Sequence, residues 1–206
     1  MNVIKKLFAA VCVTLGLATS AWADTTPDAL VKKISNEVLD TAKADKAIQA
    51  GDINKIIALV DSKVMPNVNF EVMTRSAVGP KWREATPEQR GKLQAEFKSL
   101  LVRVYAGALT QIKDQTAEIT KTQSVPGSTQ VVVQSEVRGK GEPIKLDYRL
   151  DKYDADWKII DVNVGGVWLV TSYRSQFGPE LANGGIDGLI SKLVERNKAA
   201  AAPAKS

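Results

Sequence analysis

Alternating apolar and polar positions near the C-terminal third of the chain predict two antiparallel strands. Side chains on a strand point alternately to its two faces, and a period of two runs from residue 144 to 151 and again from 157 to 164. The apolar positions on one face are Ile144, Leu146, Tyr148 and Leu150 in the first strand, and Ile160, Val162 and Val164 in the second. Turn residues at 153–156 predict a hairpin between the two strands, and Gly165 and Gly166 end or kink the second one.

A second pair of strands is predicted immediately upstream. From Thr116 onward, apolar and polar residues alternate with a period of two. Ile119 lies in the first strand, and Val131, Val133 and Val137 lie on one face of the next. A turn at 125–128 joins them, and the glycines at 139 and 141 end the second. The sequence therefore predicts about four antiparallel strands that share one apolar face.

Three helices are predicted in the N-terminal half. Thr26 and Pro27 are typical of a helix start, and the following apolar stripe predicts a helix from 27 to the mid 40s. Apolar residues at helical spacing predict a second helix over 53–64. Asn69 is expected to cap a short third helix that ends before Gly79.

The clearest helix start in the sequence is at Thr86, with proline next and Gln89 placed to complete a capping box. The apolar stripe predicts a helix up to Asp114, some 26 residues and about 39 Å long. This helix is long enough to cross the sheet, and we expect it to cover the apolar face. Further helices are expected over 172–181 and from Ile186, separated by a break at 183–185.

The order of helices, meander and helix predicts an α+β fold, a curved antiparallel sheet covered by helices with an N-terminal helical portion. Lys5 and Lys6, an apolar stretch and the Ala21-Trp22-Ala23 motif predict a signal peptide over 1–23, cleaved after Ala23. Residues 24–198 are expected to form a single domain and residues 199–206 a flexible tail. No other stretch approaches the roughly 18 apolar residues of a membrane span.

Composition excludes several classes of chemistry. The chain has no histidine, and its single cysteine, Cys12, lies in the predicted signal peptide. Val11 is too large to precede a lipidated cysteine, so a lipoprotein is not expected. Histidine triads, the common zinc sites and thiol catalysis are therefore excluded in the exported chain. Without Lys5 and Lys6, the chain has 26 basic and 23 acidic residues, and this net charge of +3 is too low and too dispersed to predict nucleic-acid binding.

Several motifs resemble the MlaC family, also known as toluene-tolerance Ttg2D-like proteins. They include N-F-E-V-M (69–73), V-G-P-K-W-R-E-A-T-P-E-Q-R (78–90), F-K-S-L-L-V-R-V-Y-A-G-A-L (97–109), W-K-I-I-D-V (157–162), G-V-W-L-V-T-S-Y-R-S-Q-F (166–177) and G-G-I-D-G-L-I (184–190). The resemblance covers nearly all of the exported chain. It implies an NTF2-like or cystatin-like fold and a periplasmic phospholipid carrier in which acyl chains occupy an apolar slot.

The same resemblance implies that lipid is exchanged between an outer-membrane lipoprotein complex and an inner-membrane ABC transporter, a permease complex carrying an MCE-domain subunit. This exchange maintains outer-membrane lipid asymmetry without covalent chemistry. Phospholipid is then cargo, no cofactor or metal is expected, and no residue is assigned a catalytic role.

Candidate lipid-binding residues lie on the long helix, the shared strand face and the aromatic segment after it. They are Leu101, Val104, Tyr105, Ala108, Val131, Val133, Leu146, Tyr148, Ile160, Val162, Val164, Trp168 and Tyr173. Periodicity alone favours an ordinary packed core for the aliphatic ones, since protein interiors rarely contain large voids. The tyrosines and the tryptophan suit a pocket mouth but serve equally often as structural residues.

Four arginines have the geometry to hold a phosphate, but exposed arginines are usually only solvated, so no headgroup site is assigned. They are Arg83, Arg103, Arg149 and Arg174.

Two other functions stay open at this point, an enzyme and a carrier of another exported amphipath. An enzyme on the same scaffold would use Asp147 or Asp161 with Tyr148, although both carboxylates alternate away from the apolar face. A buried carboxylate with a raised pKa would favour that enzyme. A carrier of another exported amphipath is the third interpretation.

Overall fold

The computed structural model describes residues 25–154 and 156–201. The predicted signal peptide and its cleavage site lie outside these residues. At the other end, helix α6 (Leu169–Ala201) continues to Ala201, so residues 199–201, which we predicted to lie in a flexible tail, are helical. None of the helices within the described ranges is both long and apolar enough to cross a bilayer.

Aspartate and threonine side chains cap the starts of the N-terminal helices. Thr26 Oγ1 accepts a hydrogen bond from Ala29 N at 3.4 Å, and α1 (Pro27–Ala44) follows as predicted. Asp45 then caps α2 (Lys46–Gln49) and Asp52 caps α3 (Ile53–Leu59). The predicted second helix is only partly regular, because it loosens into a π-helical turn, η1 (Val60–Val64), and a 3-10 turn, η2 (Met65–Asn67), around Pro66.

The two caps expected from local sequence are present. Asn69 Oδ1 accepts from Val72 N at 3.1 Å and begins α4 (Phe70–Val78), which ends at Gly79 and continues into η3 (Gly79–Glu84). Thr86 and Gln89 form a reciprocal capping box at the start of α5 (Pro87–Thr110). Helix α5 ends at Thr110, four residues short of the predicted Asp114.

The sheet is an antiparallel meander of five strands in chain order, β1 (Thr116–Ser124), β2 (Val131–Arg138), β3 (Ile144–Tyr153), β4 (Asp156–Val164) and β5 (Val167–Trp168). The α+β fold is therefore confirmed, with one more strand than the four predicted. Gly165 and Gly166 both have positive φ, at 57° and 95°, and turn the chain so that β5 pairs with the end of β4.

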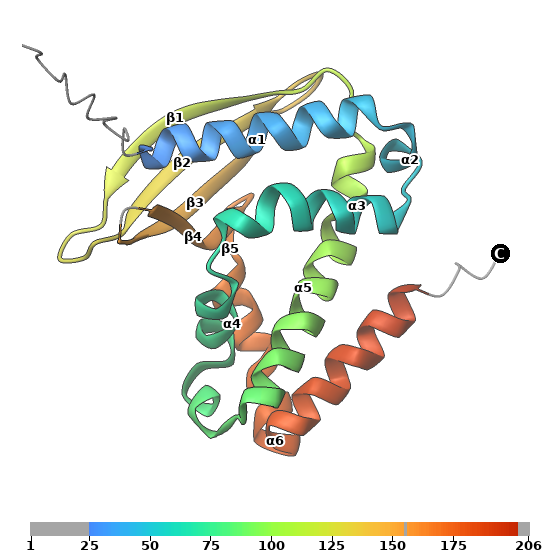
Figure 1. The fold of residues 1–206 in the computed structure, drawn as a ribbon, viewed down its shortest axis with the longest axis vertical. Helices are drawn as coiled ribbons and strands as arrows, with labels where there is room; N and C mark the ends of the chain where they lie inside the picture. Colours follow the sequence, from blue (N-terminus) through green and yellow to red (C-terminus); the bar gives the residue numbers. More distant parts are fainter. Residues whose placement is uncertain (1–24, 155, 202–206) are drawn as a thin grey trace, which may run out of the picture.

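Helix α1, and not α5, lies along the sheet (Figure 1). Val31 and Ile34 of α1 pack against Val133, Leu150 and Ile159 of the strands. Most of helix α5 lies outside the sheet, beside α4 and α6 (Figure 1). Phe97 and Phe177 are fully buried in the core between these helices. The expectation that α5 covers the sheet was wrong, because an apolar stripe shows that a helix is buried but does not identify its partner.

Helix α6 kinks at Gly185, whose φ of 62° and ψ of −156° are not helical. This kink is the break predicted at 183–185. The first half begins at Leu169, three residues before the predicted start, and the second half returns along α5. Leu93 and Leu189, both fully buried, belong to the resulting core.

Candidate functional site

The sheet face that α1 covers, here called the inner face, is closed over most of its length. Val133 and Leu150 are completely buried there and Ile159 is nearly so. They pack with Val31 and Ile34 of α1 into the first of three apolar clusters. This part of the inner face has the character of an ordinary core.

A second cluster lies between α4, α5 and α6. The ring of Phe97 lies 4.9 Å from that of Tyr173 and 5.3 Å from that of Phe177, both in edge-to-face geometry. Leu101 and Tyr105 of α5, only half-buried, pack against this cluster. Val162 and Val164 reach the same cluster from the inner face of β4.

A third cluster joins α2, α3 and the C-terminal half of α5, with Val102 and Ile112 among its buried members. Most domains have one contiguous core with smaller satellite clusters, whereas here the buried apolar side chains form three clusters, of which the first lies on the inner face. They are linked by few residues, with Val162 and Val68 shared by the first and second clusters and Val38 by the first and third. The apolar interior is therefore divided.

Half-buried apolar side chains gather where the first and second clusters meet, and we call this set the inner-face junction. Leu146 pairs with Val164 across β3 and β4, and Tyr148 pairs with Val162. Leu146 is half-buried although it belongs to none of the three clusters. The junction consists of Leu101, Tyr105, Leu146, Val162 and Val164.

Six of the other predicted lipid-binding residues divide among three environments. Val133 and Tyr173 lie in closed core, and Val131 and Tyr148 pack against the first cluster. On α5, Val104 is 55% exposed and Ala108 is also exposed. The role of these residues in lipid binding stays a prediction. The junction gathers five of the predicted lipid-binding residues with incomplete cover.

Ile160 does not share a face with Val162 and Val164, so the predicted alternation was wrong there. Arg149 pairs with Asp161 and Leu150 pairs with Ile159, which leaves Ile160 as the extra residue of a β-bulge. The bulge turns Ile159 to the inner face and Ile160 to the opposite, outer face. Trp168 also lies on the outer face, since it pairs with Asn163.

Burial raises the pKa of three tyrosines near the interior. For Tyr148 desolvation is the main cause, and hydrogen bonds with Ser35 of α1 and Ser135 of β2 oppose it. These bonds tie α1 to the sheet, which is a structural role. Burial likewise raises the pKa of Tyr105 and of Tyr173. All three phenols stay protonated at neutral pH, so each is available as a hydrogen-bond donor.

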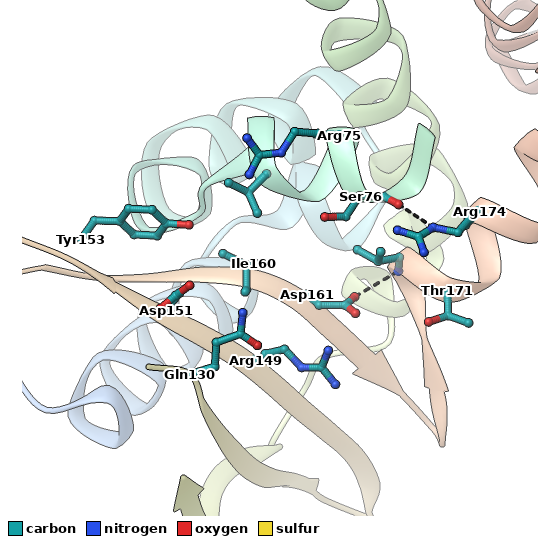
Figure 2. Close-up of a pocket in the computed structure, with 12 residues that line it drawn as sticks. Arg75, Ser76, Gln130, Arg149, Asp151, Tyr153, Ile160, Asp161, Thr171 and Arg174 are labelled. Atoms are coloured by element: carbon teal, nitrogen blue, oxygen red, sulfur yellow. Dashed lines mark hydrogen bonds between the residues drawn. The ribbon is translucent and has the colours of Figure 1, made fainter. Parts of the chain in front are cut away.

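Asp161 on the outer face is the buried carboxylate that would favour an enzyme. Its Oδ1 accepts from Val162 N at 2.9 Å and from Val170 N at 3.0 Å, so it caps the start of α6 (Figure 2). Desolvation raises the pKa of Asp161, while the two amides and Arg149 oppose the shift. The cap accounts for the burial of Asp161. Sequence reasoning missed this cap because Val170 lies nine residues from Asp161, and a predicted kink at Gly165 and Gly166 does not show which groups meet across it.

Asp161 lies beside Arg149 on the outer face. The Arg149 guanidinium lies 4.6 Å from the centre of the Trp168 ring, in a cation–π arrangement beside Asp161. In the ranges 25–154 and 156–201, no group of three or more acidic, histidine or cysteine residues could hold a metal ion. Asp147 has a raised pKa, chiefly through desolvation, and lies with Asp161 on the outer face, away from Tyr148.

Comparisons with known proteins agree on one family. The sequence model of the family described as MlaC protein matches residues 32–195. The toluene tolerance protein ttg2D of Pseudomonas putida is 25% identical over 182 residues, covering 85% of both chains. The intermembrane phospholipid transport system binding protein MlaC of Haemophilus influenzae is 25% identical over 180 residues, covering 85% of this chain and 84% of its own.

A solved structure shows the same fold. The phospholipid-binding protein from Ralstonia solanacearum, determined in complex with a phospholipid, superposes with a TM-score of 0.81 at 41% sequence identity. The match covers 85% of this chain and 98% of the other.

Proposed function

The chain belongs to the MlaC protein family, and from this we propose that it is a periplasmic phospholipid carrier that holds acyl chains at the inner-face junction. The observation that carries the proposal is the division of the apolar interior into three clusters with half-buried aliphatic residues between them. A relative with 41% identity is named as a phospholipid-binding protein and was determined with a phospholipid. The junction gives the acyl chains an apolar surface to bind.

The energetics of a carrier require little more than such a surface. Roughly 30 acyl methylenes at about 0.8 kcal/mol each gain on the order of 25 kcal/mol on leaving water, and a bilayer offers nearly the same gain. The protein therefore needs only to match the membrane. Separation of the first cluster, beneath α1, from the second, between α4, α5 and α6, would admit acyl chains between them, because among the described residues only Val162 and Val68 belong to both.

We infer that lipid passes between the protein and a partner only while the two are docked, since acyl chains exposed to water would lose this entire gain in free energy. As the resemblance to the MlaC family implies, the partners would be an outer-membrane lipoprotein complex and an inner-membrane permease complex with an MCE-domain subunit. A cleaved signal peptide over 1–23 would place the mature chain in the periplasm, between these complexes.

Organic extraction and lipid mass spectrometry of the purified mature protein test the proposal, with a parallel lipid-free preparation as control. Stoichiometric diacyl phospholipid is the expected result. A bound species of another mass would identify a carrier of a different amphipath. A stable, empty protein that takes up no lipid from vesicles would refute the carrier function.

A further inference from the structure

An arginine-lined cavity opens on the outer face of the sheet, away from the inner-face junction. It measures about 380 Å³ and lies between β3, β4, α4 and the start of α6 (Figure 2). Three arginines from different elements line it, Arg75 from α4, Arg149 from β3 and Arg174 from α6. Hydroxyl groups of Ser76, Tyr153 and Thr171 line it as well.

Two of the arginines are held in place by neighbouring groups. Arg174 Nε donates to Ser76 O at 2.8 Å, which fixes the guanidinium beside α4 (Figure 2). Arg149 is stacked on Trp168, and its buried Nε has no hydrogen-bond partner among residues 25–154 and 156–201. Guanidinium groups fixed in this way lose less conformational entropy when they bind a ligand.

One oxygen of each acidic group in the cavity already accepts hydrogen bonds from the protein. Asp161 Oδ1 accepts from two backbone amides, and Asp151 Oδ1 accepts from Thr129 Oγ1 at 2.6 Å. Within the described ranges, neither Arg75 nor Arg174 forms an ion pair with a carboxylate. Three guanidiniums therefore face two carboxylates, and both carboxylates have internal hydrogen-bond donors.

A second cavity of about 430 Å³ adjoins the first and extends the positive surface. It shares Arg75, Ser76 and Arg174 with the first cavity and adds Arg83 beside Trp82. No acidic residue is among its lining residues. The structure thus brings together three of the four arginines that sequence analysis singled out, adds Arg75, and leaves Arg103 on α5.

We propose that the first cavity binds a phosphate-type oxyanion through Arg75, Arg149 and Arg174. Planar guanidinium groups match the oxygens of phosphate with paired hydrogen bonds. The start of α6 contributes little here, because Asp161 already caps it. The anion is either free phosphate or the headgroup phosphate of a phospholipid, and the second source rests on the function proposed above.

Titration of the lipid-free protein with inorganic phosphate, followed by NMR of the arginine Nε–Hε and backbone amide groups, tests the site. Saturable shifts are expected at Ser76, Thr171 and the three arginines. R75Q and R174Q should each weaken binding by about tenfold or more, as expected for a charge-assisted hydrogen bond. K121Q, which removes an exposed charge on β1, should bind as wild type, and chloride at equal ionic strength should reproduce none of the shifts.

Lipid-loaded protein separates the two sources of phosphate. If the cargo headgroup occupies the cavity, loading abolishes phosphate binding and R75Q and R174Q change the headgroup composition of extracted lipid. If the site takes free phosphate, loading leaves the titration unchanged. Unsaturable shifts, or wild-type affinity in folded R75Q and R174Q, would overturn the proposal. Because the titration uses lipid-free protein, its outcome is independent of whether the chain carries phospholipid.

Discussion

Glutamate substitutions at two valines of the inner face should have opposite consequences. Val133 on β2 is completely buried beneath α1, whereas Val164 at the end of β4 is half-buried at the inner-face junction. We expect V133E to unfold the protein or strongly lower its melting temperature. V164E should leave a folded protein that no longer holds phospholipid.

The magnitudes follow from burial. An unpaired carboxylate at Val133 would cost several kcal/mol, out of a total stability of about 5–15 kcal/mol for a domain. At about 2–4 °C per kcal/mol for a chain of this size, the melting temperature would fall by roughly 10 °C or more. Glutamate at Val164 can reach water, so its cost reduces to lost strand packing, about 1 kcal/mol. A charge there would face acyl chains, which cannot solvate it.

Circular dichroism melts and lipid mass spectrometry on the same preparations check both outcomes. Q123E serves as the control because it adds one negative charge on the exposed strand β1, and it should match wild type in both assays. If folded V164E retained stoichiometric phospholipid, the junction would not contact the chains. If V133E melted like wild type, the assignment of Val133 to a closed core would be wrong.

Three further predictions concern stability. Because burial raises the pKa of Asp161, the unfolded chain releases this proton at lower pH than the folded one. Wild type should therefore lose stability relative to D161N as pH rises from about 4 toward the folded-state pKa. Urea denaturation of both proteins over this pH range measures the difference, and a gain in the stability of wild type relative to D161N would contradict the prediction. N69A removes the cap on Val72 N and should lower the melting temperature by about 2–4 °C, corresponding to about 1 kcal/mol, while N69D should retain the cap. G185A places a side chain at φ 62° and ψ −156° and should cost on the order of 1–3 kcal/mol by chemical denaturation, whereas an unchanged stability would show that the kink relaxes.

Local sequence predicted the elements whose cause is local. The Thr86–Gln89 capping box and the Asn69 cap involve residues three apart, so the sequence contains both partners within one turn. The β3–β4 hairpin was likewise predicted, since its turn and alternation are contiguous. The β-bulge at Ile160 was missed because Ile159 and Ile160 are both apolar, and either could continue the alternating pattern.

Features that depend on distant residues were not predictable in the same way. The choice of α1 over α5 as the cover of the sheet depends on which of two amphipathic helices packs there, and both have an apolar stripe. Arg75, Arg149 and Arg174 come from α4, β3 and α6, so only the folded chain shows that they line one cavity. The resemblance to the MlaC family indicated the function without locating these groups.

The two faces of β4 differ in what each can contribute to a lipid carrier. Val162 and Val164 face the inner-face junction, while Asp161 faces the arginine cavity. In the proposed carrier, the apolar face would bind acyl chains in proportion to buried area, which is nearly the same for phospholipids with equal chains and different headgroups. It would therefore give affinity without headgroup selectivity. If the proposed carrier distinguishes headgroups, the difference must arise at polar groups, and fixed guanidiniums that recognise phosphate oxygens by geometry are suited to that role.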